Sequence, residues 1–404
     1  MEARWEFKWE NNKLYAFIVA ILPCIMMYKV PIVDKGAATV IVLACGIVLL
    51  FTMHQIDGQN VKLLLPGIIY LIYSVSRSAG NTIEIILQIS VFIHLYAICS
   101  NKMDIVACKK YIKTISMIAS ICVIVQYVAY LALNIHIPMI AYDYCLEDLQ
   151  YYRYKFIPGM MYRPCAFFLE PSHMAQYLML GLALCLLDKH TEYRKALIIS
   201  LGMLSTTSGM GIVMLISIWG WFYFSQVHQN KKDKFRILFL GAMVALVVTS
   251  IAISIPGIQR ILARIFGSFG NETSSYNAIN GRLFWWDTYI SSLKGPDLIY
   301  GRGSATLPEN YLTGFMEVLY AYGIIGVFLY YNMLLYFLHK SNNALSSCII
   351  ILIGGLMYFA NLTGFIYNIF YLGLILSSIK QNMSSVEETE PEVLNQKAFK
   401  YIKY

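Results

Sequence analysis

The stretch TISMIASICVIVQYVAYLALNI, residues 114–135, decides the fold class. It carries no charged residue, and a helix needs about 20 largely apolar residues to cross a bilayer. The whole chain has the same character, because 58% of its 404 residues are hydrophobic, 13% are charged and the mean hydropathy is +0.59. A soluble domain is about a quarter charged. The composition therefore predicts an all-α polytopic integral membrane protein.

Similar apolar stretches recur along the chain and predict about twelve membrane-spanning helices. The seventh and eighth run together through residues 206–209, which form either a tight turn or a break in one long helix. The predicted helices cover approximately 14–29, 36–53, 61–76, 82–99, 114–135, 166–187, 194–208, 209–225, 235–256, 312–338, 344–360 and 362–379.

The distribution of Lys and Arg predicts the orientation. With a cytoplasmic N-terminus, the inside segments hold 20 of these residues and the outside segments hold the remaining 11 of 31. Cytoplasmic loops are enriched in Lys and Arg, so both termini are predicted to be cytoplasmic. The first apolar segment follows a charged start and has no small-residue cleavage site, which indicates a retained span rather than a signal peptide.

This orientation places two long loops on the outer side. Long loops in a compact protein are usually functional or disordered. The predicted parts are helices one to five (1–135), the first large loop (136–165), helices six to nine (166–256), the second large loop (257–311), helices ten to twelve (312–379) and a mobile cytoplasmic tail (380–404).

The nine cysteines lie mostly in apolar segments, where they act as small hydrophobic residues. No Cys or His spacing typical of a metal site occurs, so we expect no metal and no cofactor. Cys145 and Cys165 could share the first outer loop, and a disulfide between them stays an open alternative to two free thiols. The net charge of +8 is explained by inside loops that face anionic lipid, and nothing suggests nucleic-acid binding.

The first long loop is rich in tyrosine. Aromatic faces stack on sugar rings, and phenol hydroxyls bond sugar hydroxyls. The alternative is an aromatic belt at the membrane interface. Six tyrosines in one loop favour a carbohydrate surface, with Tyr152 and Tyr162 as glycan contacts; the six are Tyr142, Tyr144, Tyr151, Tyr152, Tyr154 and Tyr162.

The loop leads into YRPCAFFLEPSH, residues 162–173, at the predicted entry to the sixth helix. Arg163, Glu170 and His173 are ionisable groups at a depth where charges are costly and usually line a cavity. Glu170 and His173 are three residues apart and would share a helix face, while Pro171 would weaken the helix there. The alternative is a structural Glu–Arg pair that holds a helix end. We favour a functional site.

The second long loop contains NGRLFWW (280–286), GRG (301–303) and ENYL (309–312). Arginine offers a planar fork that matches diphosphate oxygens, and glycines beside Arg302 would let the backbone approach a ligand closely. No GK[ST] follows, so this is not a Walker loop. Trp286 is either a sugar-stacking residue or an interface anchor.

Several other polar residues fall within the predicted helices. Glu84 is expected near the outer end of the fourth helix, where it could pair with Arg77. Packing positions with satisfied hydrogen bonds are the preferred reading for His94, Gln88 and Gln126.

The order of these motifs resembles the O-antigen polymerase and O-antigen ligase superfamily of Gram-negative bacteria. The similarity covers roughly residues 160–335, and the helix topology matches over the rest. It rests on an Arg before an FxEPSH-type helix entry, a TTSG turn at 206–209, and an outer loop with GR, W, GxG and NYL elements that ends in the GIIG helix at 323–326.

The resemblance implies a GT-C-like glycosyltransferase of the inner membrane that works at its periplasmic face and uses undecaprenyl-diphosphate-linked oligosaccharide as donor and acceptor. A polymerase joins the growing glycan to the non-reducing end of the next lipid-linked repeat unit, and a ligase moves the finished glycan to lipid A–core. It also implies a chain-length regulator protein as a partner. Ligases carry His-Asn before the last large-loop helix, where this chain has Glu309-Asn310. The polymerase is therefore favoured.

The expected reaction breaks an anomeric C–O bond to a diphosphate, a leaving group that needs charge stabilisation. The acceptor hydroxyl needs a base. Two other classes stay open, a lipid-linked oligosaccharide flippase and a structural membrane subunit. The expected diphosphate ligands are Arg163, Arg282 and Arg302, the expected catalytic residues are Glu170 with His173 and, as second choice, Glu309, and the expected glycan contacts are Tyr152, Tyr162, Trp286 and Asn310.

Overall fold

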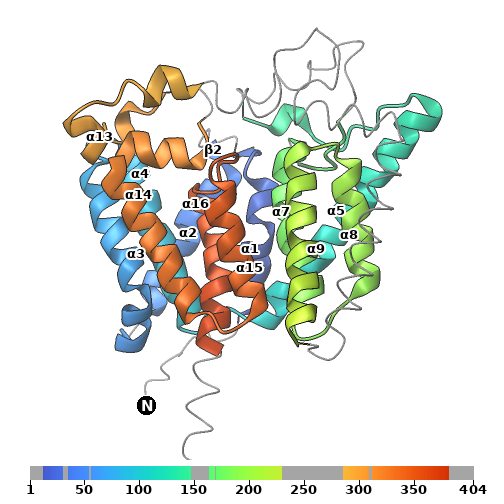
Figure 1. The fold of residues 1–404 in the computed structure, drawn as a ribbon, viewed down its shortest axis with the longest axis horizontal. Helices are drawn as coiled ribbons and strands as arrows, with labels where there is room; N and C mark the ends of the chain where they lie inside the picture. Colours follow the sequence, from blue (N-terminus) through green and yellow to red (C-terminus); the bar gives the residue numbers. More distant parts are fainter. Residues whose placement is uncertain are drawn as a thin grey trace, which may run out of the picture.

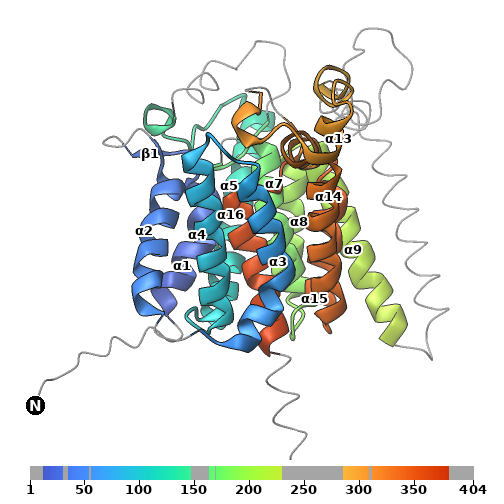
Figure 2. The same ribbon diagram turned by 90° about the vertical axis from the view of Figure 1, so that its left-hand side faces the viewer.

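The computed structural model describes residues 12–30, 35–53, 56–146, 163–168, 170–229, 285–308 and 312–381. Figure 1 shows the helices of these parts side by side in one bundle, and Figure 2 shows the same bundle from the side. A helix occurs at eleven of the twelve predicted positions, while the predicted helix at 235–256 lies outside the described residues.

The helix bounds follow the apolar stretches closely. They are α1 (Lys13–Ile25), α2 (Ala37–Thr52), α3 (Gly58–Ser76), α4 (Thr82–Cys99), α5 (Ile105–Leu133), α7 (Pro171–Leu187), α8 (Tyr193–Ser205), α9 (Gly209–Gln229), α14 (Gly314–Lys340), α15 (Ala344–Leu356), and a last helix formed by α16 (Phe365–Tyr367), η6 (Asn368–Leu372) and residues 373–381.

The described helices make this a helical membrane protein. Four segments are long and apolar enough to cross a bilayer, and several shorter apolar helices pack beside them. The four segments are Thr82–Cys99, Ile105–Leu133, Gly209–Val227 and Gly314–Lys340.

Short non-helical elements join the helices at a few places. The two-residue strands β1 (Lys29–Val30) and β2 (Lys35–Gly36) pair antiparallel, a small departure from the predicted all-α class. A 3₁₀ turn, η1, covers Tyr142–Tyr144. The predicted second loop contains a π-helical turn η4 (Trp286–Ile290), the short helix α13 (Pro296–Tyr300) and a 3₁₀ turn η5 (Ser304–Thr306).

Two predicted helix starts are wrong for identifiable reasons. Helix α5 begins at Ile105 rather than 114, because Asp104 caps it by accepting a hydrogen bond from the Ala107 N–H at 2.9 Å. Its first turns carry lysines that an apolar window excludes. Helix α7 begins at Pro171 rather than 166, since proline suits the first helical position, where no N–H is needed. Pro171 therefore starts this helix and does not break it.

Small residues bring α5 close to α7 and α8. A Cβ atom on Gly181 of α7 would lie 2.1 Å from the Ser116 hydroxyl oxygen, and one on Gly202 of α8 would lie 2.5 Å from that of Ser120. Such small-residue contacts are typical of helix packing in membranes.

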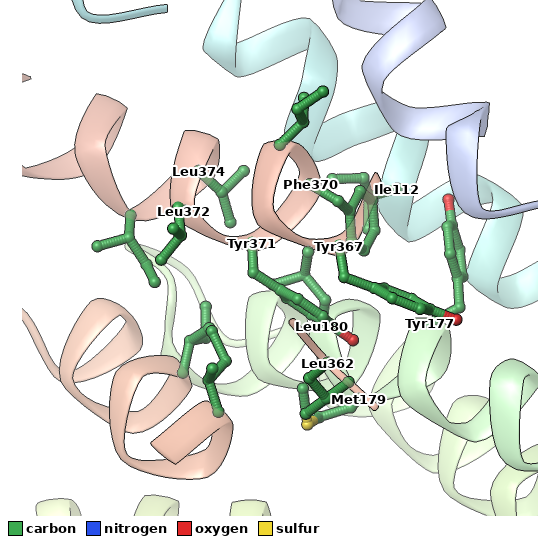
Figure 3. Close-up of a cluster of buried hydrophobic side chains, with 14 of the residues drawn as sticks. Ile112, Tyr177, Met179, Leu180, Leu362, Tyr367, Phe370, Tyr371, Leu372 and Leu374 are labelled. Atoms are coloured by element: carbon green, nitrogen blue, oxygen red, sulfur yellow. The ribbon is translucent and has the colours of Figure 1, made fainter. Parts of the chain in front are cut away.

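The last helix packs its aromatic side chains against α7. Tyr177 stacks on Phe370 at a centroid distance of 5.1 Å, and the Tyr371 hydroxyl donates a hydrogen bond to the Gln176 carbonyl oxygen at 2.6 Å. Figure 3 shows Tyr177, Phe370 and Tyr371 meeting in this buried cluster. These contacts fix the first turns of α7 against the centre of the bundle.

One end of the bundle gathers ion pairs, and we call it the basic end. Lys109 pairs with Asp188 at 2.9 Å, Lys113 and Lys195 pair with Glu192, and Lys380 lies 3.7 Å from a carboxylate oxygen of Asp57. The described chain begins and ends here, because the Asn12 N–H bonds the Lys102 carbonyl at 3.2 Å. The opposite end, which we call the loop end, carries the starts of α7 and α14 (Figures 1 and 2).

Candidate functional site

The entry to α7 holds three of the predicted site residues. Glu170 is the N-cap residue, with extended backbone (φ −129°, ψ 145°), and His173 lies in the first turn. The helical same-face argument for these two residues is therefore wrong, because Glu170 precedes the helix. The Ser172 hydroxyl donates a hydrogen bond to the Glu170 carboxylate at 3.0 Å, which orients that carboxylate.

Arg163 and Glu170 lie around one buried thiol. Burial raises the pKa of Cys165 to about 12; the nearby Glu170 carboxylate raises it further and the Arg163 guanidinium opposes the rise. Both charged groups are thus within electrostatic reach of the same sulfur atom. Cys145 and Cys165 are free thiols in this structure.

A side chain of α5 holds the backbone before α7 in place. Ala166 is fully buried and has φ 51°, a left-handed conformation that is uncommon without glycine. Its N–H donates a hydrogen bond to the Gln126 side-chain oxygen at 2.8 Å, while the Gln126 amide donates to the Ile137 carbonyl at 2.9 Å. Gln126 is a satisfied packing residue, as predicted, and it positions the entry segment.

The segment 206–208 is a tight turn between two helices. Thr206, Thr207 and Ser208 are all buried, and Thr207 has φ 52°. A Cβ atom on Gly211 of α9 would lie 3.2 Å from the Ala175 Cβ of α7 and 3.4 Å from the Thr206 hydroxyl oxygen. The turn therefore lies beside the second turn of α7, next to its entry.

The Gly-Arg-Gly segment docks on a break in α14. Gly323 interrupts that helix with φ 65° and ψ −169°. The Arg302 and Gly303 N–H groups, each at 2.9 Å, donate to the Tyr320 and Ala321 carbonyls. The glycines beside Arg302 thus permit close approach to a broken helix of the same chain.

The Arg302 side chain has partners within this region. Its guanidinium bonds the Asp297 carboxylate at 3.1 Å, the Ser292 carbonyl at 3.2 Å and the Tyr320 hydroxyl at 3.5 Å. The Tyr320 hydroxyl, followed by the Asp297 carboxylate, raises the pKa of Arg302. This arginine fastens the loop segment to α14.

Trp286 belongs to a stack of aromatic rings at the loop end. Its ring is nearly parallel to that of Phe315, 7° apart with centroids at 6.1 Å, and Phe315 also stacks with Tyr358 at 4.4 Å. Trp286 is 37% exposed and Tyr358 is 43% exposed. The arrangement suits both sugar stacking and an interface anchor.

The expected Arg77–Glu84 pair does not form among the described residues. The Arg77 guanidinium donates to the Gly301 carbonyl at 2.6 Å. Glu84 accepts a hydrogen bond from the Gln88 amide at 3.0 Å, and that amide also bonds the Tyr322 hydroxyl at 2.7 Å. Arg77 and Gln88 are therefore parts of the α3–α4–α14 packing.

Sequence reasoning missed Glu317. This acid lies in the first turn of α14 and accepts a hydrogen bond from the Asn361 amide, whose own oxygen accepts from the Thr363 hydroxyl at 3.0 Å. An acid inside the apolar stretch 312–338 was the signal that could have found it.

His94 is a satisfied packing residue, as predicted. Its ring bonds the Tyr15 hydroxyl at 2.6 Å and the Val42 carbonyl at 3.0 Å. Within the described part of the chain, no three His, Cys, Asp or Glu residues are grouped to hold a metal ion. The predicted site residues Tyr152, Tyr162, Arg282, Glu309 and Asn310 lie outside the described residues.

Comparisons with known proteins assign no family to the chain. No family model matches it, and no curated protein matches it significantly.

Proposed function

We propose that this protein is a glycan polymerase that joins polyprenyl-diphosphate-linked repeat units. The observation that carries the proposal is the α7 entry, where an arginine and an oriented carboxylate surround the same buried group at the loop end. The reaction needs one cation for the diphosphate and one base for the acceptor hydroxyl, and this entry supplies both.

The bond that breaks joins the anomeric carbon of the donor glycan to its diphosphate. The acceptor hydroxyl at the non-reducing end of the next lipid-linked unit attacks that carbon. Glu170 accepts the hydroxyl proton as the new C–O bond forms, and His173 in the next turn orients or shares this role. The polyprenyl diphosphate leaves with the bonding electrons, and Arg163 stabilises its charge.

The remaining predicted residues take supporting roles in the proposal. Arg282 joins Arg163 at the diphosphate. Arg302 holds the loop segment on α14, since its donors have partners there. Trp286 offers an exposed ring to the glycan. Glu309 is the second choice of base, and Asn310, Tyr152 and Tyr162 are further glycan contacts.

We also propose where the reaction occurs. The loop end faces the periplasm and the basic end faces the cytoplasm of a Gram-negative inner membrane, because basic segments favour the cytoplasmic side. Their ion pairs gather at one end of the bundle, which supports this orientation. A chain-length regulator is the proposed protein partner.

The test is deletion of the gene in the native host, with lipopolysaccharide resolved on a gel. The proposal predicts core bearing a single repeat unit and no ladder. Bare core with polymer left on the lipid carrier would mean a ligase instead. Bare core with single lipid-linked units on the cytoplasmic side would mean a flippase, and an unchanged ladder would contradict any role in glycan assembly.

A further inference from the structure

Two buried polar atoms next to the α7 entry have no hydrogen-bond partner among the described residues. They are the side-chain carbonyl oxygen of Gln176 and the hydroxyl oxygen of Thr207. Each residue is only 3% exposed. Native proteins pair nearly all buried polar atoms, so each exception calls for an explanation such as a bound water or a ligand.

The two residues lie at the same level of the bundle. Gly211 of α9 meets both Ala175 on α7 and Thr206 in the turn, within 3.4 Å of its Cβ position. Gln176 and Thr207 are the next residues along the chain from these two contacts. Helix α7 thus brings the Gln176 amide to the level of the Thr207 turn, two turns or less from Glu170.

The turn leaves the Thr207 hydroxyl over while its neighbours are satisfied. The Thr206 hydroxyl donates to the Met203 carbonyl at 2.7 Å and accepts from the Ser208 N–H at 3.2 Å. The Ser208 hydroxyl accepts from the Gly211 N–H at 3.4 Å. Thr207 alone combines an unpaired hydroxyl with φ 52°, a conformation that is exceptional for a β-branched residue.

Gln176 shows the same contrast within one residue. Its main-chain carbonyl accepts the Tyr371 hydroxyl at 2.6 Å, which fixes the residue against the last helix. Its side-chain oxygen is buried and unpaired. An amide oxygen needs a donor, and a diphosphate at neutral pH offers none, so the missing partner is a hydroxyl group or water.

We infer that Gln176 and Thr207 form a subsite that binds hydroxyl groups of a sugar ring beside Glu170. The inference rests on the proposed function and deepens it by assigning the glycan recognition next to the base. The Gln176 oxygen accepts one sugar hydroxyl, and the Thr207 hydroxyl donates to or accepts from a second. Neutral partners of this kind select sugar hydroxyls over phosphate.

The experiment uses the full chain in membranes of the deletion strain, supplied with lipid-linked repeat units. Thr207→Val keeps the shape and the branched Cβ but removes the hydroxyl, and Gln176→Met removes the amide. We expect each variant to raise the apparent KM for repeat units about 10-fold, the effect of one lost hydrogen bond of ordinary strength. The melting temperature should not fall, since the lost groups have no partner in the free protein.

Two controls sharpen the result. Thr207→Ser restores a hydroxyl and should recover the wild-type KM. Ser346→Ala removes another fully buried hydroxyl without a partner, at the start of α15, and should leave KM unchanged.

An unchanged KM in stable Thr207→Val and Gln176→Met proteins would overturn the inference and assign both atoms to water. The proposed function would then still stand, because the wild type joins repeat units in the same assay. If Thr207→Val lowers the melting temperature, the KM of Gln176→Met decides. A wild type that joins no repeat units contradicts the proposed function itself, and the inference with it.

Discussion

The entries to α7 and α14 use the same residue types in different ways. Each helix begins at the loop end, and each has an arginine before it and an acid at its start, Arg163 with Glu170 and Arg302 with Glu317. At α14 these side chains bond other protein groups, Asp297 and Tyr320 for the arginine and Asn361 for the acid.

The α7 entry instead has buried polar atoms that the described protein leaves unpaired, on Gln176 and Thr207. A charged group that already has internal partners stabilises a fold, while an open polar atom beside an oriented acid is available to a ligand. The comparison teaches that partners, more than residue types, separate a structural entry from a binding entry.

The largest expected effect is on catalysis at the α7 entry. Glu170→Gln removes the proposed base and keeps the side-chain size, so repeat-unit joining should fall by about 10² to 10⁴-fold. Rates are measured with purified protein in liposomes. Glu317→Gln is the matched control at α14 and should reduce the rate far less. Equal losses in the two variants would erase the distinction between the entries.

The next effect is on the stability of the α14 entry. Gly301→Ala places a Cβ atom 2.4 Å from the Ala321 backbone, at φ 75°. Left-handed strain and overpacking together predict a loss of about 3 kcal/mol in unfolding free energy. Thermal unfolding in detergent measures it. Gly220→Ala is the control, because its Cβ would meet nothing within 4 Å, and a loss as large there would refute the docking account.

A smaller effect separates the two arginines. Arg302→Ala breaks a partly exposed ion pair with Asp297 and should cost about 1 kcal/mol or less of stability, with the joining rate changed only a few-fold. Arg163→Ala should reduce the rate by a much larger factor. If Arg302→Ala abolished joining while the protein stayed as stable as wild type, Arg302 would be a diphosphate ligand, as the sequence had suggested.

The smallest effect concerns pH at the basic end. Hydrogen bonds from Lys113 and Lys195 lower the pKa of Glu192. A lowered folded-state pKa means that the stabilisation is complete above the unfolded value of about 4.3 and disappears as pH falls through the folded value. The melting temperature should therefore drop more between pH 5 and pH 3 in the wild type than in Glu192→Gln. Identical pH profiles would show that the ion pairs contribute nothing.

The helices were predictable from sequence because apolar length is a local property. Periodicity and length located α4 at 82–99 exactly where the structure has it, and the basic loops at 100–113 and 188–195 meet at one end as the charge pattern required. The start of α5 was misplaced because its lysines lie in helical turns beyond the apolar core.

The site was only partly predictable, because partners depend on tertiary contacts. The sequence identified Glu170, His173 and Arg163, but it could not show that Arg302 bonds Asp297 or that the Gly301–Gly303 segment docks at Gly323. Gln176 and Thr207 carried no sequence signal, since a buried polar residue differs from a paired one only in its surroundings.

The most direct test of the central claim is a single-turnover assay with purified protein in liposomes and repeat units extracted on their polyprenyl diphosphate from the deletion strain. Released polyprenyl diphosphate and the length of the glycan product are measured together. The account predicts that wild type forms dimers and longer products with one diphosphate released per bond, and that Glu170→Gln forms almost none. Equal product from both proteins, or none from wild type, would contradict it.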